Sequence, residues 1–268
     1  MKLLHLTDTH FTRPEDLLQF PDELANVFKQ QMSFEKKLHK IIAQEELDTF
    51  DFVVITGDLV HECKADAYEA YFNTLNETFG DLPIYFVTGN HDLNVEFYKA
   101  RQESYQNNYF DYDFVRDGIH FIILDSSEDD RIIGSFTDKQ VERLEATLAE
   151  NKLPKFIFLH HPLFGWKESD IYSIQDSQAV TDLLTQYDII GLLTGHTHQL
   201  GIHVHKNLVQ HTSYHFGFGI SHVNAANVME INNLTGYSVI EYTEDQILSI
   251  RPRIIHPCPT PLFRLERS

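Results

Sequence analysis

Residues Ile84–Asp92 read IYFVTGNHD, an apolar run that stops at a glycine and is followed by an amide, an imidazole and a carboxylate. The apolar run predicts a strand that is buried on both faces, so the residues after its C-terminal end lie at one edge of a sheet. Gly-Asn-His-Asp alone is also compatible with an ordinary β-turn, because Gly and Asn are turn residues. The choice between a functional sheet edge and an ordinary turn depends on whether the pattern recurs along the chain.

The pattern does recur along the first 200 residues. Apolar strands are predicted at Lys2–Leu6, Phe52–Ile55, His120–Leu124, Phe156–Leu159 and Ile189–Leu193, and polar residues follow each of them: Thr7-Asp8-Thr9-His10, Gly57-Asp58, Asp125, His160-His161 and Gly195-His196-Thr197-His198. Amphipathic helical patterns separate the strands, and alternation of strand and helix predicts βαβ units with right-handed crossovers. The carboxyl ends of the strands then meet at one edge, and we expect these polar side chains to lie together.

The remaining segments predict a smaller set of elements. Phe11–Pro21 is expected to be a loop, followed by a long amphipathic helix with a break near Ser33. Thr137 and Gln140 form a capping box ahead of another helix. Residues 201–256 predict mainly antiparallel sheet, including a hairpin of Tyr237–Tyr242 with Gln246–Ile250, and 257–268 predict an extended C-terminal tail. We interpret residues 1–268 as a single domain.

Composition limits the classes of function. The chain has 268 residues and a formal net charge of −19, which argues against sequence-independent binding to nucleic acid. No apolar stretch reaches the roughly 20 residues of a membrane span, and the N-terminus lacks a signal sequence, so we expect a cytoplasmic protein with no membrane partner. The two cysteines, Cys63 and Cys258, are expected to be free thiols.

The strand ends supply two carboxylates, one side-chain amide and several imidazoles, without a thiolate. That donor set suits divalent or trivalent Mn, Fe or Zn, and it disfavours a closed structural zinc site. Asp8-x-His10 and Gly57-Asp58 each occur often by chance in unrelated proteins. Their order, each behind a separate apolar strand, is what favours a metal centre.

These motifs in this order closely resemble those of the calcineurin-like metallophosphoesterase superfamily over about Met1–Leu200. The His160-His161-Pro162 form of the fourth motif, with Leu124-Asp125-Ser126 before Gly134, resembles the class III cyclic nucleotide and glycerophosphodiester phosphodiesterases. The resemblance implies an α/β fold, a four-layer αββα sandwich of two mixed β-sheets flanked by helices. It also implies a cofactor of two metal ions at the C-terminal edge.

The resemblance further implies a role for each residue of the motifs. Asp8, His10 and His198 would bind one metal, Asn90, His160 and His196 the other, and Asp58 would bridge both. His161 is expected outside the ligand set, behind the ligands or exposed, because adjacent residues on a strand end point in opposite directions. His91 would protonate the leaving group or stabilise charge in the transition state. Asp92 would orient that imidazole, with a turn-capping carboxylate as the alternative.

The function implied is hydrolysis of a small-molecule phosphodiester, a cyclic nucleotide or glycerophosphodiester, by attack of a metal-bound hydroxide. The alternatives are a phosphomonoesterase, a DNA nuclease of the double-strand-break repair type, and a non-catalytic scaffold. The acidic charge disfavours the nuclease, and the complete set of ligands disfavours the scaffold. The expected partner is the small phosphoester, and the sequence leaves open whether the protein is a homo-oligomer.

Loops over the centre are expected to set specificity, mainly Phe11–Pro21 and Leu163–Ile174. Arg13, and Trp166 with Lys167, can hold a phosphate or stack on a base, although an exposed Arg and a packed Trp are the commoner roles. Five histidines follow the last motif, and sheet or surface roles are favoured for them over a third metal site: His203, His205, His211, His215 and His222. Gly89 is expected to permit a tight turn that brings Asn90 to the metal.

Overall fold

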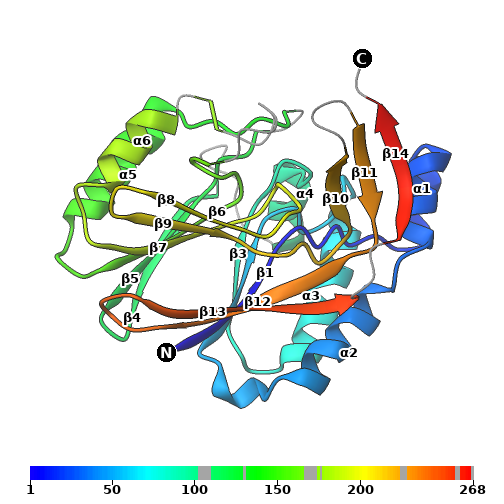
Figure 1. Ribbon diagram of the computed structural model, residues 1–268, viewed down its shortest axis with the longest axis horizontal. Helices are drawn as coiled ribbons and strands as arrows, with labels where there is room; N and C mark the ends of the chain where they lie inside the picture. The colour runs from blue at the N-terminus through cyan, green and yellow to red at the C-terminus, as the bar shows by residue number, and fades with distance from the viewer. Residues whose placement is uncertain are drawn as a thin grey trace.

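The computed structural model describes residues 1–101, 110–128, 131–165, 174–175, 177–223, 228–256 and 260–266 (Figure 1). Its first large sheet has five strands in the order β13-β12-β1-β2-β3. The bounds are β1 Lys2–Leu6, β2 Phe52–Thr56, β3 Ile84–Val87, β12 Thr235–Tyr242 and β13 Ile247–His256. Strands β1, β2 and β3 run parallel to one another, and β12 and β13 are antiparallel additions on the other side of β1.

The second large sheet has six strands in the order β4-β5-β6-β7-β9-β8. The bounds are β4 Tyr112–Arg116, β5 Ile119–Leu124, β6 Lys155–Leu159, β7 Ile189–Thr194, β8 Gly201–His205 and β9 Leu208–Thr212. Strands β5, β6, β7 and β9 are parallel, and the outer strands β4 and β8 are antiparallel to their neighbours. Both large sheets are therefore mixed, as predicted.

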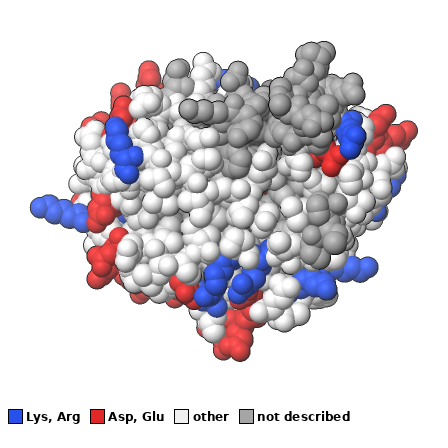
Figure 2. Space-filling view, viewed as in Figure 1, with Lys and Arg blue, Asp and Glu red and all other residues white. Residues whose placement is uncertain are grey.

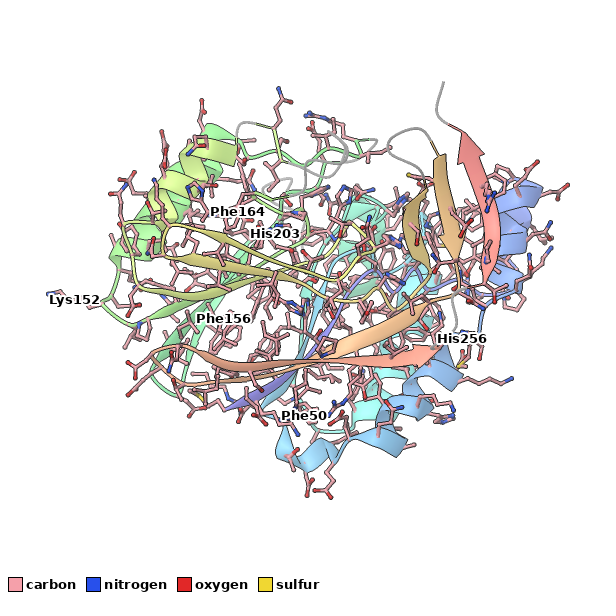
Figure 3. The ribbon with its side chains drawn as sticks, viewed as in Figure 1. Phe50, Lys152, Phe156, Phe164, His203 and His256 are labelled. Carbon is pink, nitrogen blue, oxygen red and sulfur yellow. The ribbon has the colours of Figure 1, made fainter. Side chains whose placement is uncertain are left out.

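The two sheets pack face to face, and alternate residues of each central strand face opposite layers. In β2, Phe52 and Val54 face the other sheet, where they join Phe121 and Phe156, the last labelled in Figure 3. Val53 and Ile55 belong instead to the core beneath the helices on the outer face. Burial of both faces explains why these strands are continuously apolar, and it makes the fold the predicted four-layer α/β sandwich.

Helices cover the outer face of each sheet (Figure 1). Side chains of α2 (Phe34–Gln44) and α3 (Ala65–Phe79) pack on the first sheet with Phe97 and Tyr98 of α4 (Asn94–Arg101). The second sheet is covered by α5 (Asp138–Ala149) and α6 (Ser177–Leu184). The predicted break is present, because α1 (Asp22–Lys29) ends before Ser33, the residue that precedes α2.

Several elements differ from the sequence prediction. Strand β3 is an edge strand, so Ile84 and Tyr85 are only half-buried, and the prediction that it is buried on both faces is right only for Phe86 and Val87. Helix α4 and strand β4 were not predicted, because charged residues surround α4 and β4 is half-exposed along its whole length. The loop Phe11–Pro21 contains a short 3-10 helix, η1 (Asp16–Gln19), and a second, η2 (Leu47–Thr49), follows α2.

Residues 201–256 contain the predicted hairpin, β12 with β13, although β9 also pairs in parallel with β7. In the described part of the tail, Pro261–Glu266 forms β14, the outer strand of a three-stranded sheet β10-β11-β14. Strands β10 (Gly219–Val223) and β11 (Val228–Asn232) complete that sheet. Cys63 is a buried free thiol, and Cys258 lies outside the described residues.

Charged side chains lie mainly around the margin of the face shown in Figure 2. Among the described residues, no helix is long and apolar enough to cross a bilayer.

The capping box at the start of α5 gives a test of the fold. The Thr137 hydroxyl accepts from the Gln140 backbone N–H, and the Gln140 side chain accepts from the Thr137 backbone N–H. Thr137→Ala is expected to lower the free energy of unfolding by about 1 kcal/mol, since one N-terminal amide of the helix loses its acceptor. Urea unfolding measures this. Thr147→Ala is the control, because it makes the same substitution in the interior of α5. An equal decrease in the free energy of unfolding in both variants would contradict the capping role.

Candidate metal centre

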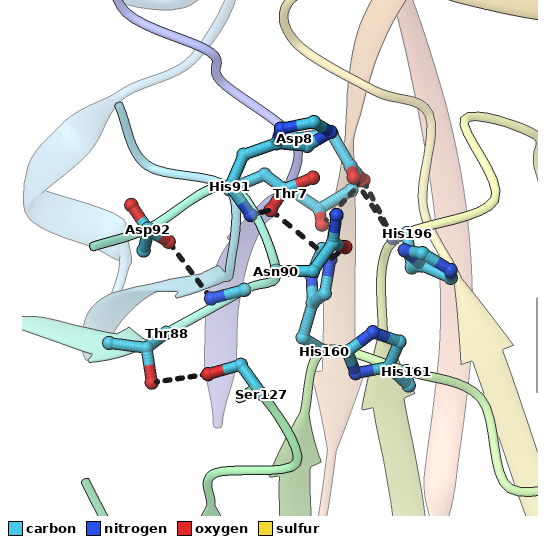
Figure 4. A network of polar contacts seen from close by, with 12 residues as sticks. Thr7, Asp8, Thr88, Asn90, His91, Asp92, Ser127, His160, His161 and His196 are labelled. Atoms are coloured by element: carbon cyan, nitrogen blue, oxygen red, sulfur yellow. Dashed lines mark hydrogen bonds and ion pairs between the residues drawn. The ribbon is translucent and has the colours of Figure 1, made fainter. Parts of the chain in front are cut away.

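The carboxyl ends of β1, β2, β3, β6 and β7 meet at one edge, and the predicted polar residues converge there (Figure 4). Five of these residues have a left-handed backbone, with φ of 49° at Asp8, 43° at His10, 51° at Asp58, 69° at His196 and 53° at His198. This conformation is unfavourable for residues with a Cβ, and it concentrates at functional sites. Here the left-handed turns direct the side chains back over the strand ends.

One group of side chains consists of Asp8, His10, Asp58 and His198, whose candidate ligand atoms lie within 4.8 Å of one another. His198 Nδ1 lies 2.5 Å from the Phe218 carbonyl oxygen, so this nitrogen is the N–H donor and Nε2 keeps its lone pair. His198 Nε2 lies 3.0 Å from His10 Nε2 and 3.4 Å from Asp8 Oδ1. A lone pair directed at a second imidazole and a carboxylate is the arrangement that a cation stabilises.

The second group lies on the other side of Asp58. His160 Nδ1 donates to the Thr56 carbonyl over 2.8 Å, and Nε2 lies 3.2 Å from Asn90 Oδ1 and 3.4 Å from Asp58 Oδ1. The His196 ring is 5.1 Å from the His160 ring, and the His196 amide donates to both oxygens of Asp8. Asp58 therefore faces His160 with Oδ1 and His10 with Oδ2, the latter over 3.4 Å.

The donor set fits two metal ions. Asp8 and Asp58 are buried, and among the described residues neither forms an ion pair with a Lys or Arg. Burial raises the pKa of Asp8, although His198 and His160 oppose the change. For Asp58, burial is outweighed by three histidines, and its pKa lies well below the usual value. Burial would lower the pKa of His160, but the nearby Asp58 raises it to about 9. The carboxylates thus attract positive charge to this edge.

His91 lies beside this centre and is oriented by Glu62, a residue that sequence reasoning missed. The His91 amide donates to Asp58 Oδ1 over 2.9 Å, and His91 Nδ1 lies 2.8 Å from Glu62 Oε1. The Glu62 amide in turn donates to the His91 carbonyl over 2.9 Å. His61, also missed, stacks on His91 at 4.4 Å between ring centroids, and its Nδ1 lies 2.8 Å from His10 Nδ1. Both residues follow Gly57-Asp58 closely, which was the available signal.

The predicted role of Asp92 is wrong. Its carboxylate accepts from the backbone N–H groups of Leu59, Val60 and Gly89 and from the Tyr68 hydroxyl, at 2.9–3.1 Å. It is buried beneath the turn and joins the loops after β2 and β3, so it does not orient His91. These contacts agree with the alternative role, in which Asp92 is a turn-capping carboxylate. Burial and then the Asp58 carboxylate raise the pKa of Asp92 to about 7, against the three amides.

His161 was expected outside the ligand set, but it is buried, and one of its ring nitrogens lies within 4.8 Å of ring nitrogens of His160 and His196, a group that could hold a metal ion. Its Nδ1 lies 2.8 Å from Ser126 Oγ, and its Nε2 lies 3.0 Å from the Ile132 carbonyl oxygen. Both ring nitrogens therefore have protein partners, although the ring is 4.3 Å from that of His196.

Gly89 is required for a different reason from the one predicted. Its φ is not positive, but a Cβ would lie 2.3 Å from the Asp58 amide nitrogen and 2.9 Å from His160 Nε2. Only a glycine allows the chain to pass this close to the ligands.

The remaining candidates join no described group of potential metal ligands or lie outside the described residues, although the His215 ring stacks on that of His198 at 5.6 Å. Arg13 is held by Asp16 and Asp66, with Nη2 distances of 2.7 and 3.0 Å, so it has a structural role. His211 and His215 are buried among sheet residues, and Nε2 contacts the Ser238 hydroxyl and the Leu234 carbonyl, respectively. His203 and His205 lie on β8. None of these four joins a described cluster of metal-binding geometry. Trp166, Lys167 and the His222 side chain lie outside the described residues.

Comparison with known proteins agrees with this geometry. The family model described as calcineurin-like phosphoesterase matches residues 1–200, and the chain belongs to that family. It is therefore a metal-dependent phosphoester hydrolase, as the sequence predicted, and the family is dinuclear.

The relatives lie within the predicted subgroup. This chain is 22% identical to a probable cyclic nucleotide phosphodiesterase of Xenorhabdus bovienii, and the similarity covers 91% of this chain and 97% of that protein. It is 30% identical to a probable glycerophosphodiester phosphodiesterase of Arcobacter nitrofigilis, over 56% of this chain and 57% of that one. A dimetal phosphatase from Danio rerio has the same fold, with a TM-score of 0.70, 14% identity, and 100% and 99% of the two chains covered.

The corrected role of Asp92 can be tested by Asp92→Asn. An amide accepts through one oxygen only, so donors that the carboxylate satisfies lose their acceptor. We expect the free energy of unfolding to fall by about 2 kcal/mol or more. Urea unfolding of the metal-free protein measures this, with the exposed Asp81→Asn as control. Unchanged stability together with slower turnover would instead favour the catalytic role.

Proposed function

We propose that this protein is a dinuclear metal-dependent phosphodiesterase acting on a small-molecule phosphodiester. The observation that carries the proposal is the position of Asp58, whose two carboxylate oxygens face different histidines, His10 and His160, at a buried sheet edge. A carboxylate so placed can bridge two cations. The names of the relatives favour a phosphodiester, because they are cyclic nucleotide and glycerophosphodiester phosphodiesterases.

Each ligand follows from the groups described above. Asp8, His10 and His198 would hold one ion, Asn90, His160 and His196 would hold the other, and Asp58 would contribute to both. When bound, such ions would supply an activated water and would neutralise charge on the phosphate oxygens. Hydrogen bonds from His160 Nδ1 to the Thr56 carbonyl and from His198 Nδ1 to the Phe218 carbonyl hold the rings in place and leave Nε2 as the nitrogen that would face a metal ion.

His91 moves the proton to the departing oxygen. Glu62 accepts from Nδ1 and holds the ring, so Nε2 is the nitrogen left to face a substrate. The side chain of His91 is 29% exposed, which leaves it within reach of a ligand, whereas the ligand His160 is wholly buried. Glu62 is thus the positioning residue that the sequence prediction assigned to Asp92.

The first experiment tests the metal bridge. Asp58→Ala is expected to lose bound metal and to lower turnover of bis-p-nitrophenyl phosphate by about 100-fold or more, because it removes a ligand of both ions. Metal content is measured by mass spectrometry after loading with Mn. Asp81→Ala, at an exposed carboxylate, is the control and should keep both properties. Full metal content in Asp58→Ala would reject the bridging role.

The second experiment tests His91. His91→Ala is expected to keep its metal and to lower turnover by roughly 100-fold for substrates with alkoxide leaving groups, which need a proton. Substrates with a p-nitrophenolate leaving group should lose much less activity. Glu62→Gln should also lower turnover more for alkoxide than for p-nitrophenolate leaving groups, but by a smaller factor. His39→Ala, at an exposed residue, should lower turnover of neither substrate. Equal losses for both leaving groups would contradict proton transfer by His91.

A further inference from the structure

A cavity of about 490 Å³ lies beside His10, between the loop after β1 and the junction of α1 with α2. Its volume is that of a small-molecule site. The apolar side chains that line it include Phe11, Leu17, Phe28, Met32 and Phe34. These residues take no part in the proposed metal centre, but the cavity adjoins His10, a proposed metal ligand.

Aromatic rings connect this cavity to the metal centre. Phe28 packs edge to face against His61, with centroids 5.0 Å apart, and against Phe218 at 5.9 Å. Phe218 in turn stacks on His10 at 4.8 Å. Phe34 is fixed against Phe11 at 5.2 Å on another side of the cavity. The aromatic walls are held by their neighbours and therefore exist before a ligand enters.

Gln31, one of the residues that line the cavity, has a buried donor without a partner among the described residues. Buried Lys37 donates to the carbonyls of Phe216 and Gly217 at 2.8 and 2.7 Å, and to Gln31 Oε1 at 3.2 Å. The bond from Lys37 orients the Gln31 amide, whose Nε2 is buried and has no hydrogen-bond partner in the described part of the chain. Such a donor favours a ligand with an acceptor.

We propose that this cavity holds the aromatic base of a nucleotide phosphodiester, which makes nucleotides rather than glycerophosphodiesters the preferred substrates. The proposal rests on the proposed function, because the phosphodiester must reach the adjoining centre. A planar base buries its faces against Phe28 and Phe34 and offers ring nitrogens or carbonyl oxygens to Gln31. Polar residues such as Thr12, Ser33 and Glu35 also line the cavity, but a glycerol moiety has no planar face to stack on the aromatic rings and gains less from them.

Kinetics of Phe28 variants test the proposal. In Mn-loaded protein, Phe28→Ala should raise the KM for 3′,5′-cyclic AMP about tenfold or more, the range found for loss of base stacking. The kcat for this substrate, and both constants for glycerophosphoethanolamine, should stay near those of the wild type. Phe28→Leu, which keeps an apolar side chain, should have an intermediate KM. Leu18→Ala, at a residue 89% exposed in the neighbouring η1, is the control. An equal rise in KM for both substrates would overturn the proposal.

Calorimetry with adenosine and metal-free protein separates this proposal from the proposed function. Binding by the wild type that weakens in Phe28→Ala supports a base-binding cavity, even if no phosphodiester is hydrolysed and the proposed function fails. If the protein hydrolyses bis-p-nitrophenyl phosphate but does not bind adenosine, the proposed phosphodiesterase function is supported and the cavity proposal is overturned.

Discussion

Asp8 and Asp58 are two carboxylates buried at the same sheet edge, in a protein whose formal net charge is already −19. Charges of the same sign repel strongly in a medium of low dielectric constant, and here imidazoles rather than Lys or Arg surround them. Several features of the surrounding structure hold the two carboxylates close together in spite of this repulsion. Left-handed turns direct the side chains inward, backbone carbonyls select the histidine tautomers, and Gly89 lets the chain pass within contact distance.

Two further carboxylates on the same loops show that environment decides role. Asp92 is buried beneath three backbone amides and the Tyr68 hydroxyl, so it holds two loops together. Glu62 is exposed to solvent and contacts the His91 imidazole, so it positions a side chain that can reach substrate. Asp58 and Asn90 lie on the loops whose shape Asp92 fixes through these hydrogen bonds. The orientation of the His91 imidazole depends on Glu62.

Much of the fold was predictable because both faces of the central strands are buried. Continuous apolar runs predicted β1, β2, β5, β6 and β7, and helical periodicity predicted α2, α3, α5 and α6. Elements at the margins were missed. Helix α4 carries charges on most sides, β4 is half-exposed, and β14 pairs with β11 about 30 residues earlier in the chain. Marginal elements are stabilised by their neighbours, and their own residue patterns are therefore weak.

The sequence by itself determined the order of the motifs and the types of donor atom at the edge, because parallel strands bring their carboxyl ends together wherever the chain places polar residues. It also determined the family. The tertiary structure decided which neighbouring side chains share a hydrogen bond: Asp92 with the backbone, Glu62 with His91, and His161 with Ser126. It also formed the cavity beside His10. Contacts between loops depend on turn geometry and packing, and one-dimensional spacing does not encode either.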